Sequence, residues 1–373
     1  MTDRKGRLSA MNRRSFLAHS GAGLAAITVT IPGAALAQGY PDKPINFVVM
    51  YAAGGGTDTV MRKIAAEMAN AKGWQINVIN KPGAVGGIAT QYVFGEESDG
   101  YTLLAGANAN KFVRVMGHID ADRVPWEDWE FMQAAVSLGS WSVRPDSPFQ
   151  TFEDVVKAAK ADPGKISIST SGTGGLWHEL ALIVAGFADI ELKYVPYKGG
   201  KPATLAGLQG ETDIAGGGVH EHIDLVRAGE LRPLQQTGTE DIVLEDGKIV
   251  WPTVGNFVPD IKPFLPLGGT YNLIVKRDIP PEVLAQIREA FVAAANSDGV
   301  KEMMDSKFFK RDVITGADAD KRAAQLETVT VDTFNKFKDQ IPGDVKTAED
   351  LGLPSPADFD TWWPPEGYEP PAS

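Results

Sequence analysis

The chain has 373 residues, of which 43% are hydrophobic and 23% are charged, and it contains no cysteine. This composition is typical of a soluble globular protein, and the length is greater than one compact core usually holds, so we expect two domains. Disulfide bonds, thiolate metal sites and a cysteine nucleophile are excluded.

The first 37 residues have the features of an export signal. NRRSFL, from Asn12 to Leu17, precedes a weakly apolar stretch rich in Gly and Ala over 21–31 and the tripeptide Ala35-Leu36-Ala37. A twin arginine, a short apolar region and a small-x-small cleavage site in this order indicate a Tat signal peptide over 1–37 rather than a frayed helix. We therefore expect a periplasmic protein whose mature form begins near Gln38.

Removing the predicted signal makes the chain more acidic. The signal holds five basic residues and one acidic residue, which leaves 31 basic and 47 acidic residues and a net charge of −16. Such a surface argues against nucleic acid or an anionic membrane as a partner. An anionic ligand would have to be held by dipoles near its binding site, because the electrostatic field of the net negative charge does not attract it.

The first half of the mature chain alternates strands and helices. A continuous apolar run over 45–51 predicts a strand buried on both faces. Three glycines follow at Gly54, Gly55 and Gly56, and helical spacing of apolar residues begins at Thr57 and continues to about residue 72. The next predicted elements are a strand at 75–80, a helix at 87–97 and a strand at 101–105. This order is typical of a parallel sheet with right-handed crossovers.

A second α/β unit of similar size follows Pro148. Its predicted helices are 151–161, 176–187, 202–208 and 222–228, and its predicted strands are 165–170, 191–196, 212–215 and 232–237. After an irregular, proline-rich stretch over 241–266 we expect a strand at 270–275 and helices at 281–294, 300–307 and 318–337. The chain would thus return to the first unit. The expected parts are the signal 1–37, domain 1 over 38–140 and 267–357, domain 2 over 141–266, and a tail over 358–373.

Glycine-rich segments stand at five of the predicted strand-to-helix junctions: 52–58, 82–87, 171–175, 198–201 and 216–218. Ligands of open α/β sheets lie at the carboxyl ends of strands, where free backbone N–H groups and helix dipoles face one place. One such loop could be only a tight turn. Five of them favour a ligand cleft between two domains.

Known chemical motifs are missing. The first loop lacks the G-x-G-x-x-G spacing, the acid after the second strand and the P-loop lysine that nucleotides require. There is no G-x-S-x-G or H-E-x-x-H motif. His220-Glu221-His222 offers a close pair of histidines without a third ligand, so we predict neither a metal nor a cofactor. We expect a binding protein and not an enzyme, and an exported cofactor enzyme remains the alternative because the Tat route carries prefolded proteins.

Several motifs together resemble those of the Bug-type periplasmic receptors, the substrate-binding proteins of tripartite tricarboxylate transporters. They occur in family order over roughly 40–335, and they are YPDKPI from Tyr40, GGGTD from Gly54, NKPGA from Asn80 with Gly86-Gly87, DGYTLL from Asp99, Ser171-Gly172, VPYKGG from Val195 and PTV from Pro252. The chain differs from the family pattern at Ala52-Ala53, where two prolines are usual. It also carries the bulky Val85 inside the second glycine loop.

The resemblance implies a type II periplasmic-binding-protein fold, a two-domain α/β Venus flytrap that closes on a small mono-, di- or tricarboxylate, aromatic ones included. Loops matching 53–58 and 82–87 would hold a carboxylate through backbone N–H groups and ordered water. Loops matching 171–173 and 197–200 would receive the ligand from the other domain. It also implies membrane permease subunits as partners of a monomeric receptor, with a ligand-presenting sensor subunit as a further alternative.

The candidate ligand-binding residues come from both units. The aromatic side chains among them would form a wall against the carbon skeleton of the ligand, or would pack beneath the loops. We also expect Gly55→Val and Gly86→Val to abolish binding while leaving the fold largely intact. The candidates are Tyr51, Ala53, Gly54, Gly55, Gly56, Thr57, Asp58, Gly83, Ala84, Gly86, Gly87, Asn108, Ser171, Gly172, Thr173, Trp177, His178, Tyr197, Lys198, Gly199, Gly200, Gly218 and His220.

Overall fold

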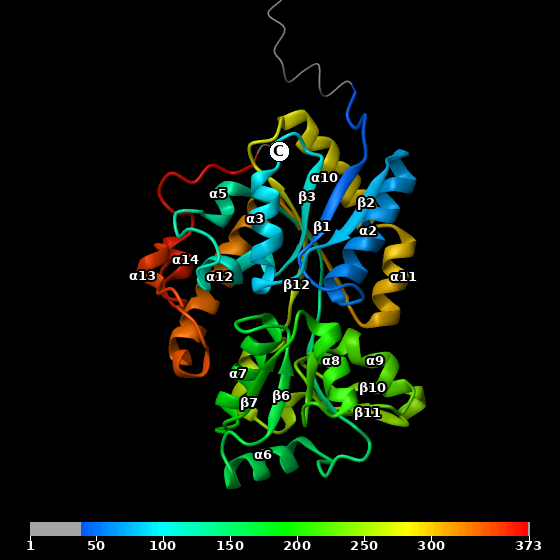
Figure 1. Cartoon of the computed structure of the whole chain (residues 1–373), viewed down its shortest axis with the longest axis vertical. Helices are drawn as coiled ribbons and strands as arrows, with labels where there is room; N and C mark the ends of the chain where they lie inside the picture. Colours follow the sequence, from blue (N-terminus) through cyan, green and yellow to red (C-terminus); the bar gives the residue numbers. More distant parts are fainter. Residues whose placement is uncertain (1–38, 372–373) are drawn as a thin grey trace, which may run out of the picture.

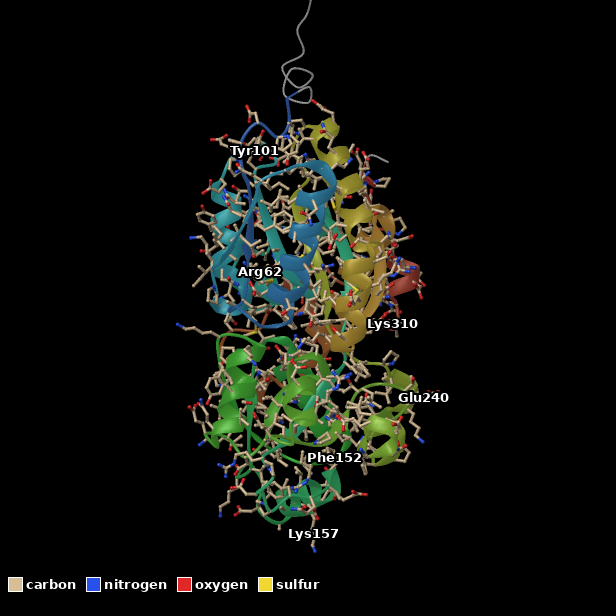
Figure 2. All side chains as sticks on the ribbon, turned by 90° about the vertical axis from the view of Figure 1, so that its right-hand side faces the viewer. Arg62, Tyr101, Phe152, Lys157, Glu240 and Lys310 are labelled. Atoms are coloured by element: carbon tan, nitrogen blue, oxygen red, sulfur yellow. The ribbon has the colours of Figure 1, made fainter. Side chains whose placement is uncertain are left out.

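The computed structural model of the protein describes residues 39–371, and the predicted signal peptide lies outside this range. Two lobes are stacked along the long axis of the molecule (Figure 1). We define lobe 1 as residues 39–137 and 268–371, and lobe 2 as residues 138–267. Figure 2 shows the same lobes from the side, with Tyr101 near the top of lobe 1 and Lys157 at the lower tip of lobe 2.

Lobe 1 is built around a six-stranded mixed sheet with the order β13-β4-β12-β3-β1-β2. Strand β1 pairs in parallel with both β2 and β3, while β12 is antiparallel to β3 and β4, and β13 is antiparallel to β4. Four of the five residues of β1 are buried, as expected for a strand covered on both faces. The strands are β1 (Ile45–Val49), β2 (Ile76–Asn80), β3 (Thr102–Ala107), β4 (Trp129–Val136), β12 (Thr270–Lys276) and β13 (Lys310–Thr315).

Helices cover the two faces of this sheet. Helix α2 buries Val60, Met61 and Ile64 at helical spacing and ends at Gly73, whose φ of 71° suits a glycine C-cap. Pro280 before α10, Pro281 at its first position and the Ser297 cap of α11 set the starts of those helices. The helices of lobe 1 are α2 (Gly56–Lys72), α3 (Gly87–Gly95), α4 (Lys111–Val115), α5 (Pro125–Asp128), α10 (Pro281–Ala295), α11 (Asp298–Lys307), α12 (Gly316–Lys336), α13 (Ala348–Leu351) and α14 (Phe359–Trp362).

Lobe 2 has a smaller sheet in which β5 lies between β8 and β9, and β6 pairs in parallel with β7. A bridge between Ile168 and Ile214 joins the two groups of strands. A hairpin of β10 and β11 lies in the segment that the sequence left irregular. The elements are β5 (Gly139–Val143), α6 (Phe152–Ala161), β6 (Ser167–Thr170), α7 (Leu176–Phe187), β7 (Lys193–Pro196), α8 (Gly200–Gln209), β8 (Ala215–Gly218), α9 (Val219–Arg227), β9 (Arg232–Gln236), β10 (Ile242–Leu244) and β11 (Ile249–Trp251).

One predicted loop is instead a strand. Gly216, Gly217 and Gly218 belong to β8, and helix α9 begins directly after them at Val219. A Cβ atom on Gly216 would lie 2.3 Å from the Ser169 carbonyl oxygen, so the strand packs closely because it has no side chain there. The prediction of a fifth glycine-rich loop was wrong, and α9 begins three residues before the predicted helix, so that it includes His220, Glu221 and His222.

Two short connections join the lobes. Residues 137–138 link β4 to β5, and the chain returns through residues 267–269, where the Ser137 N–H donates to the Gly269 carbonyl at 2.8 Å. The C-terminal segment packs on lobe 1, with the rings of Trp362 and Trp363 lying edge-on against Trp126. None of the helices within 39–371 is long and apolar enough to span a membrane.

Candidate functional site

Two neighbouring cavities lie between the lobes, at the carboxyl ends of β1 and β3. The inner cavity has a volume of about 30 Å³. It is lined by the glycine loops at the starts of α2 and α8, and by Asn108, Trp177, Glu221 and Tyr271. The outer cavity has a volume of about 550 Å³, and Tyr197 and Lys198 are among the residues that line it. Tyr51 and Ser171 line both cavities, so the two form one cleft.

The amino end of α2 already faces a carboxylate, which belongs to the protein. Gly55 occupies the N-cap position of α2 without a side-chain cap, and the Glu221 side chain of lobe 2 lies over this end. The Glu221 carboxylate accepts hydrogen bonds from the Gly218 N–H at 3.0 Å, from the Gly56 N–H and from the Trp177 side chain. Because Gly218 caps α9, two helix amino ends converge on one anion.

Glu221 was not among the predicted site residues. It stands at the third position of α9, where an acidic side chain commonly reaches back to the N-cap, so a capping signal was present in the sequence. Burial raises the pKa of this carboxyl to about 7, although the backbone donors, Trp177 and the charge of Lys201 act in the opposite direction. The group therefore exchanges its proton near neutral pH.

His220 supports the floor of the inner cavity. Its Nε2 lies 3.2 Å from the Tyr271 hydroxyl, which donates to the Ser137 Oγ at 3.0 Å, and its ring stacks on Phe309. Burial lowers the pKa of His220 to about 3, so the ring is neutral. A Cβ atom on Gly56 would lie 2.3 Å from the His220 Nε2, which explains why a glycine stands at the start of α2.

The second glycine loop also meets lobe 2. Val85 lies within it in the left-handed region with φ of 44°, and its carbonyl accepts from the Tyr51 hydroxyl at 3.4 Å. A Cβ atom on Gly172 of lobe 2 would lie 3.0 Å from the Val85 side chain. The Ala52 N–H donates to the Lys198 carbonyl at 3.4 Å across the cleft. The lobes are therefore in contact and the cleft is closed.

Most predicted site residues line one of the two cavities. They are Tyr51, Gly55, Gly56, Thr57, Asn108, Ser171, Trp177 and Gly200 at the inner cavity, and Tyr51, Gly83, Ala84, Ser171, Gly172, Thr173, Tyr197 and Lys198 at the outer cavity. Sequence analysis did not single out Glu221 or Tyr271 at the inner cavity. Tyr271 comes from β12, about 220 residues after β1, and carried no local signal.

The other predicted residues lie beside the cleft without lining it, and two of them have clear structural roles. Asp58 accepts from the Gly54 N–H and from Arg62 and Asn80, so its carboxylate holds the first loop in place. His178 accepts from the Gly174 N–H at 3.0 Å and lines a separate cavity of about 270 Å³. Burial lowers the pKa of His178 to about 4. The remaining members of this group are Ala53, Gly54, Gly86, Gly87, Gly199, Gly218 and His220.

Gly86 does not face the cleft as the sequence analysis assumed. Its φ is 107°, and a Cβ atom there would lie 1.9 Å from the Met50 Cε in the core of lobe 1. A valine at this position would disturb the fold itself. The expectation that Gly86→Val leaves the fold largely intact is therefore corrected, whereas a Cβ atom on Gly55 would make only ordinary contacts, the nearest at 3.5 Å.

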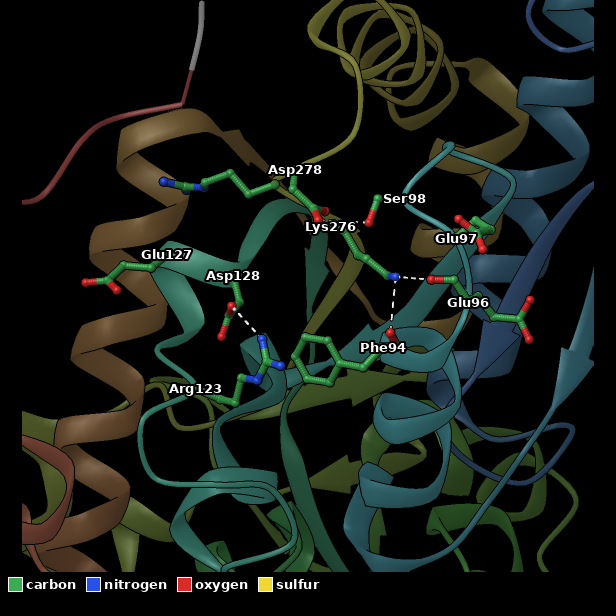
Figure 3. Close-up of a pocket in the computed structure, with 10 residues that line it drawn as sticks. Phe94, Glu96, Glu97, Ser98, Arg123, Glu127, Asp128, Lys276 and Asp278 are labelled. Atoms are coloured by element: carbon green, nitrogen blue, oxygen red, sulfur yellow. Dashed lines mark hydrogen bonds and ion pairs between the residues drawn. The ribbon is translucent and has the colours of Figure 1, made fainter. Parts of the chain in front are cut away.

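A further cavity of about 360 Å³ lies at the opposite end of lobe 1, where β3 begins (Figure 3). Its basic side chains already have partners. Lys276 donates to the carbonyl oxygens of Phe94 and Glu96, and Arg123 donates to Asp128 at 3.2 Å. Since parallel-sheet ligands bind at the carboxyl ends of strands, we place the candidate site in the cleft between the lobes.

Titratable side chains near the cleft do not assemble into a metal site. His222 turns away from His220, bonds to Ser140 and Ser142 and stacks on Trp251. Within residues 39–371, no group of three or more His, Asp or Glu side chains could hold a metal ion. The arrangement offers backbone N–H groups, aromatic rings and one carboxylate, which is a set of groups for binding a small polar molecule.

Solved structures share the two-lobed fold of this chain. Solved structures similar to it include one described as a periplasmic transporter, with a TM-score of 0.70 and 25% identity over 81% of this chain and 98% of that chain. Another is the periplasmic binding protein BugD, with a TM-score of 0.70 and 22% identity over 80% and 98% of the two chains. MatC from Rhodopseudomonas palustris with bound malate gives a TM-score of 0.65 and 20% identity over 81% and 99%.

Curated sequences agree with these structures. A UPF0065 protein of Pseudomonas sp. (strain P51) is 32% identical over 62% of this chain and 68% of its own length. A UPF0065 protein of Cupriavidus necator is 26% identical over 79% of this chain and 88% of its own length. The family profile described as "Tripartite tricarboxylate transporter family receptor" matches residues 60–330. The chain therefore belongs to the tripartite tricarboxylate transporter receptor family, whose solved relatives share its two-lobed α/β fold.

Proposed function

We propose that this protein is an extracytoplasmic receptor that captures a small organic carboxylate between its lobes and delivers it to the membrane permease of a tripartite transporter. One observation carries the proposal: glycine-rich loops of both lobes, at 83–85 and 171–173, line the outer cavity together with Lys198, so backbone groups and one cation are available to a carboxylate there. Similar proteins solved with adipate and with malate support the ligand class.

The ligand enters through the outer cavity when the lobes are apart. Closure brings the loops at 83–85 and 171–173 onto opposite sides of it, and removes water from around the dipoles that hold it. The outer cavity has the volume of a usual small-molecule site. In this proposal the receptor consists of the two domains assigned from the sequence, reaches the periplasm through the Tat signal and acts as a monomer.

Thermal unfolding of the protein without residues 1–37 tests the proposal. A carboxylate that binds only the folded state must raise the midpoint temperature of unfolding. The increase should grow with the logarithm of the ratio of the carboxylate concentration to its Kd. A panel of mono-, di- and tricarboxylates should contain at least one that does so. If no member of the panel changes the midpoint, the receptor function is contradicted.

Gly55→Val tests whether the first glycine loop belongs to the ligand site. Gly55 has φ of −79°, and the nearest atom to its Cβ position lies 3.5 Å away, so the backbone accepts a side chain. Its methyl groups would project into the inner cavity. We expect the unfolding midpoint of the free variant to stay close to that of the wild type while the shift produced by the ligand disappears; an unchanged shift would remove the first loop from the site.

A further inference from the structure

The inner cavity combines one carboxylate with aromatic rings. Among the described residues that line it, Glu221 is the one that carries a formal charge, and Tyr51, Trp177 and Tyr271 contribute rings. Aromatic faces attract cations, and a buried carboxylate seeks a positive partner. The lining therefore favours a cationic group, although the glycine loop beside it has the geometry of an anion site.

Glu221 occupies the place that a ligand carboxylate would need at the amino end of α2. Its Oε1 lies 1.9 Å from the Cβ position of Gly200 and 3.6 Å from that of Gly55, so it fills the space between the two loops. A second carboxylate placed there would face a like charge at close range. Such a pair is strongly disfavoured in a buried site.

The Glu221 carboxylate still has room for one donor. A carboxylate offers about four lone-pair positions, and those of Glu221 receive the Gly218 N–H, the Gly56 N–H and Trp177. The charged and titratable groups around it are Lys201 of α8, His220 of α9 at 3.8 Å, His222 of α9, and the hydroxyls of Tyr51 and Tyr271; the His222 Nε2 and the Glu221 Oε2 lie 2.6 and 3.1 Å from the Cβ position of Gly217. Burial lowers the pKa of both histidines to about 3, so they are neutral, and Lys201 does not line the cavity.

The volumes of the two cavities fit two different ends of one ligand. The inner cavity, at about 30 Å³, has room for a small polar group such as an ammonium. The outer cavity offers Lys198 and the backbone of the loops at 83–85 and 172–173. A carboxylate at the outer cavity and an ammonium at the inner one satisfy both sets of groups.

We propose that the inner cavity binds the ammonium group of an amino-carboxylate, with Glu221 as the residue that selects this zwitterion over a dicarboxylate. The proposal rests on the receptor function proposed above and names its ligand class. The acidic character of the chain outside the predicted signal, with 47 acidic and 31 basic residues, favours the approach of the cationic end.

Matched ligand pairs test this selection by isothermal titration calorimetry at pH 7. Glutarate is compared with 4-aminobutanoate, and adipate with 5-aminopentanoate, since each pair differs only by exchange of a carboxylate for an ammonium group. We expect the amino-carboxylate of at least one pair to bind tenfold or more tightly than its partner. Glu221→Gln should remove this preference, and Glu230→Gln, an exposed residue beyond α9, should retain it.

Proton exchange provides a second readout that needs no variant. Because the pKa of Glu221 is raised to about 7, an ammonium group that binds beside it should release protons at pH 7. The binding enthalpy of the wild type should therefore depend on the ionisation enthalpy of the buffer, and that dependence should be lost in Glu221→Gln. Proton uptake on binding would contradict the proposal.

The outcomes separate the two proposals. If dicarboxylates bind as tightly as their amino partners in both the wild type and Glu221→Gln, the selection by Glu221 is overturned and the receptor function stands. If no member of either class binds the wild type, the receptor function itself fails.

Discussion

Lys111 of α4 and Glu179 of α7 form a buried ion pair between the lobes, with 2.8 Å between Nζ and Oε2. Their side chains are 5% and 3% exposed, and Thr330 of α12 donates a further hydrogen bond to Glu179. Helix α7 belongs to lobe 2 and carries Trp177 of the inner cavity. The pair therefore fixes the helix that brings an aromatic wall of the site against lobe 1.

Lys111→Met should destabilise the closed protein strongly. Removing the cation leaves the Glu179 carboxylate buried without its charge partner, which typically costs about 3–5 kcal/mol in the free energy of unfolding. Lys336→Met is the control, because Lys336 and Asp332 form an exposed pair whose loss costs about 1 kcal/mol or less. Urea denaturation of both variants measures the difference, and equal effects would show that the Lys111 pair is not buried in solution.

Gly200→Ala should displace Glu221. The added Cβ atom would lie 1.9 Å from the Glu221 Oε1, so the carboxylate has to leave its donors on α2 and α9. We expect weaker ligand binding and a lower unfolding midpoint. Gly95→Ala is the matched control, because within residues 39–371 no atom outside its own helix backbone and chain neighbours lies within 4 Å of its Cβ position, and it should leave binding unchanged. Wild-type affinity in Gly200→Ala would contradict the position of Glu221 in the closed cleft.

The stability of the protein should depend on pH through Glu221. Burial raises the pKa of this carboxyl from 4.5 in an unfolded chain to about 7, so the folded state binds the proton more tightly. The resulting stabilisation is fully present below pH 4.5 and is lost as the pH rises through 7. Relative to the wild type, Glu221→Gln should therefore gain about 3 kcal/mol between pH 4.5 and 7.5.

Urea denaturation of wild type and Glu221→Gln across this pH range measures the difference. Other buried groups with shifted pKa values, such as Glu327 and His222, are common to both proteins and cancel in the comparison. A difference in free energy of unfolding that is independent of pH would show that Glu221 titrates as an exposed carboxyl.

The C-terminal segment should contribute to the stability of lobe 1. Phe359 is 3% exposed and stacks with Trp363, and Trp363 in turn packs on Trp126 of α5. Phe359→Ala should lower the free energy of unfolding by about 3 kcal/mol, as expected for an aromatic side chain removed from a packed site. Val329→Ala, an exposed position on α12, should cost less than about 1 kcal/mol. A negligible effect of Phe359→Ala would mean that the segment is detached in solution.

Local sequence patterns determined much of the fold. The uninterrupted apolar run before Gly54 predicted β1, and the helical spacing after Thr57 predicted α2 within a residue or two of its observed start. Thr151 and Asp154 form the capping box of α6 at the place where the sequence predicted that helix to begin. These features depend on neighbours within one or two turns, so they can be recognised without knowing the fold.

The strands without a clear local pattern were missed. β4, β5 and β13 lie in segments without a clear strand pattern, and the glycines of β8 have a composition that predicts a loop. β8 forms because Gly216 lets its backbone approach β6, a contact between segments almost fifty residues apart. The low strand propensity of glycine disfavours a strand at this position, and the tertiary contact with β6 outweighs that preference.

The sequence by itself determined the family motifs, the alternating α/β order and the glycine loops from which a cleft was expected. Only the tertiary structure decided what lies in that cleft. Glu221 comes from α9, Gly56 from α2 and Tyr271 from β12, and they meet because the chain leaves lobe 1 and returns to it. Which side chains face one another across two lobes depends on how distant segments pack, and no pattern among sequence neighbours records that.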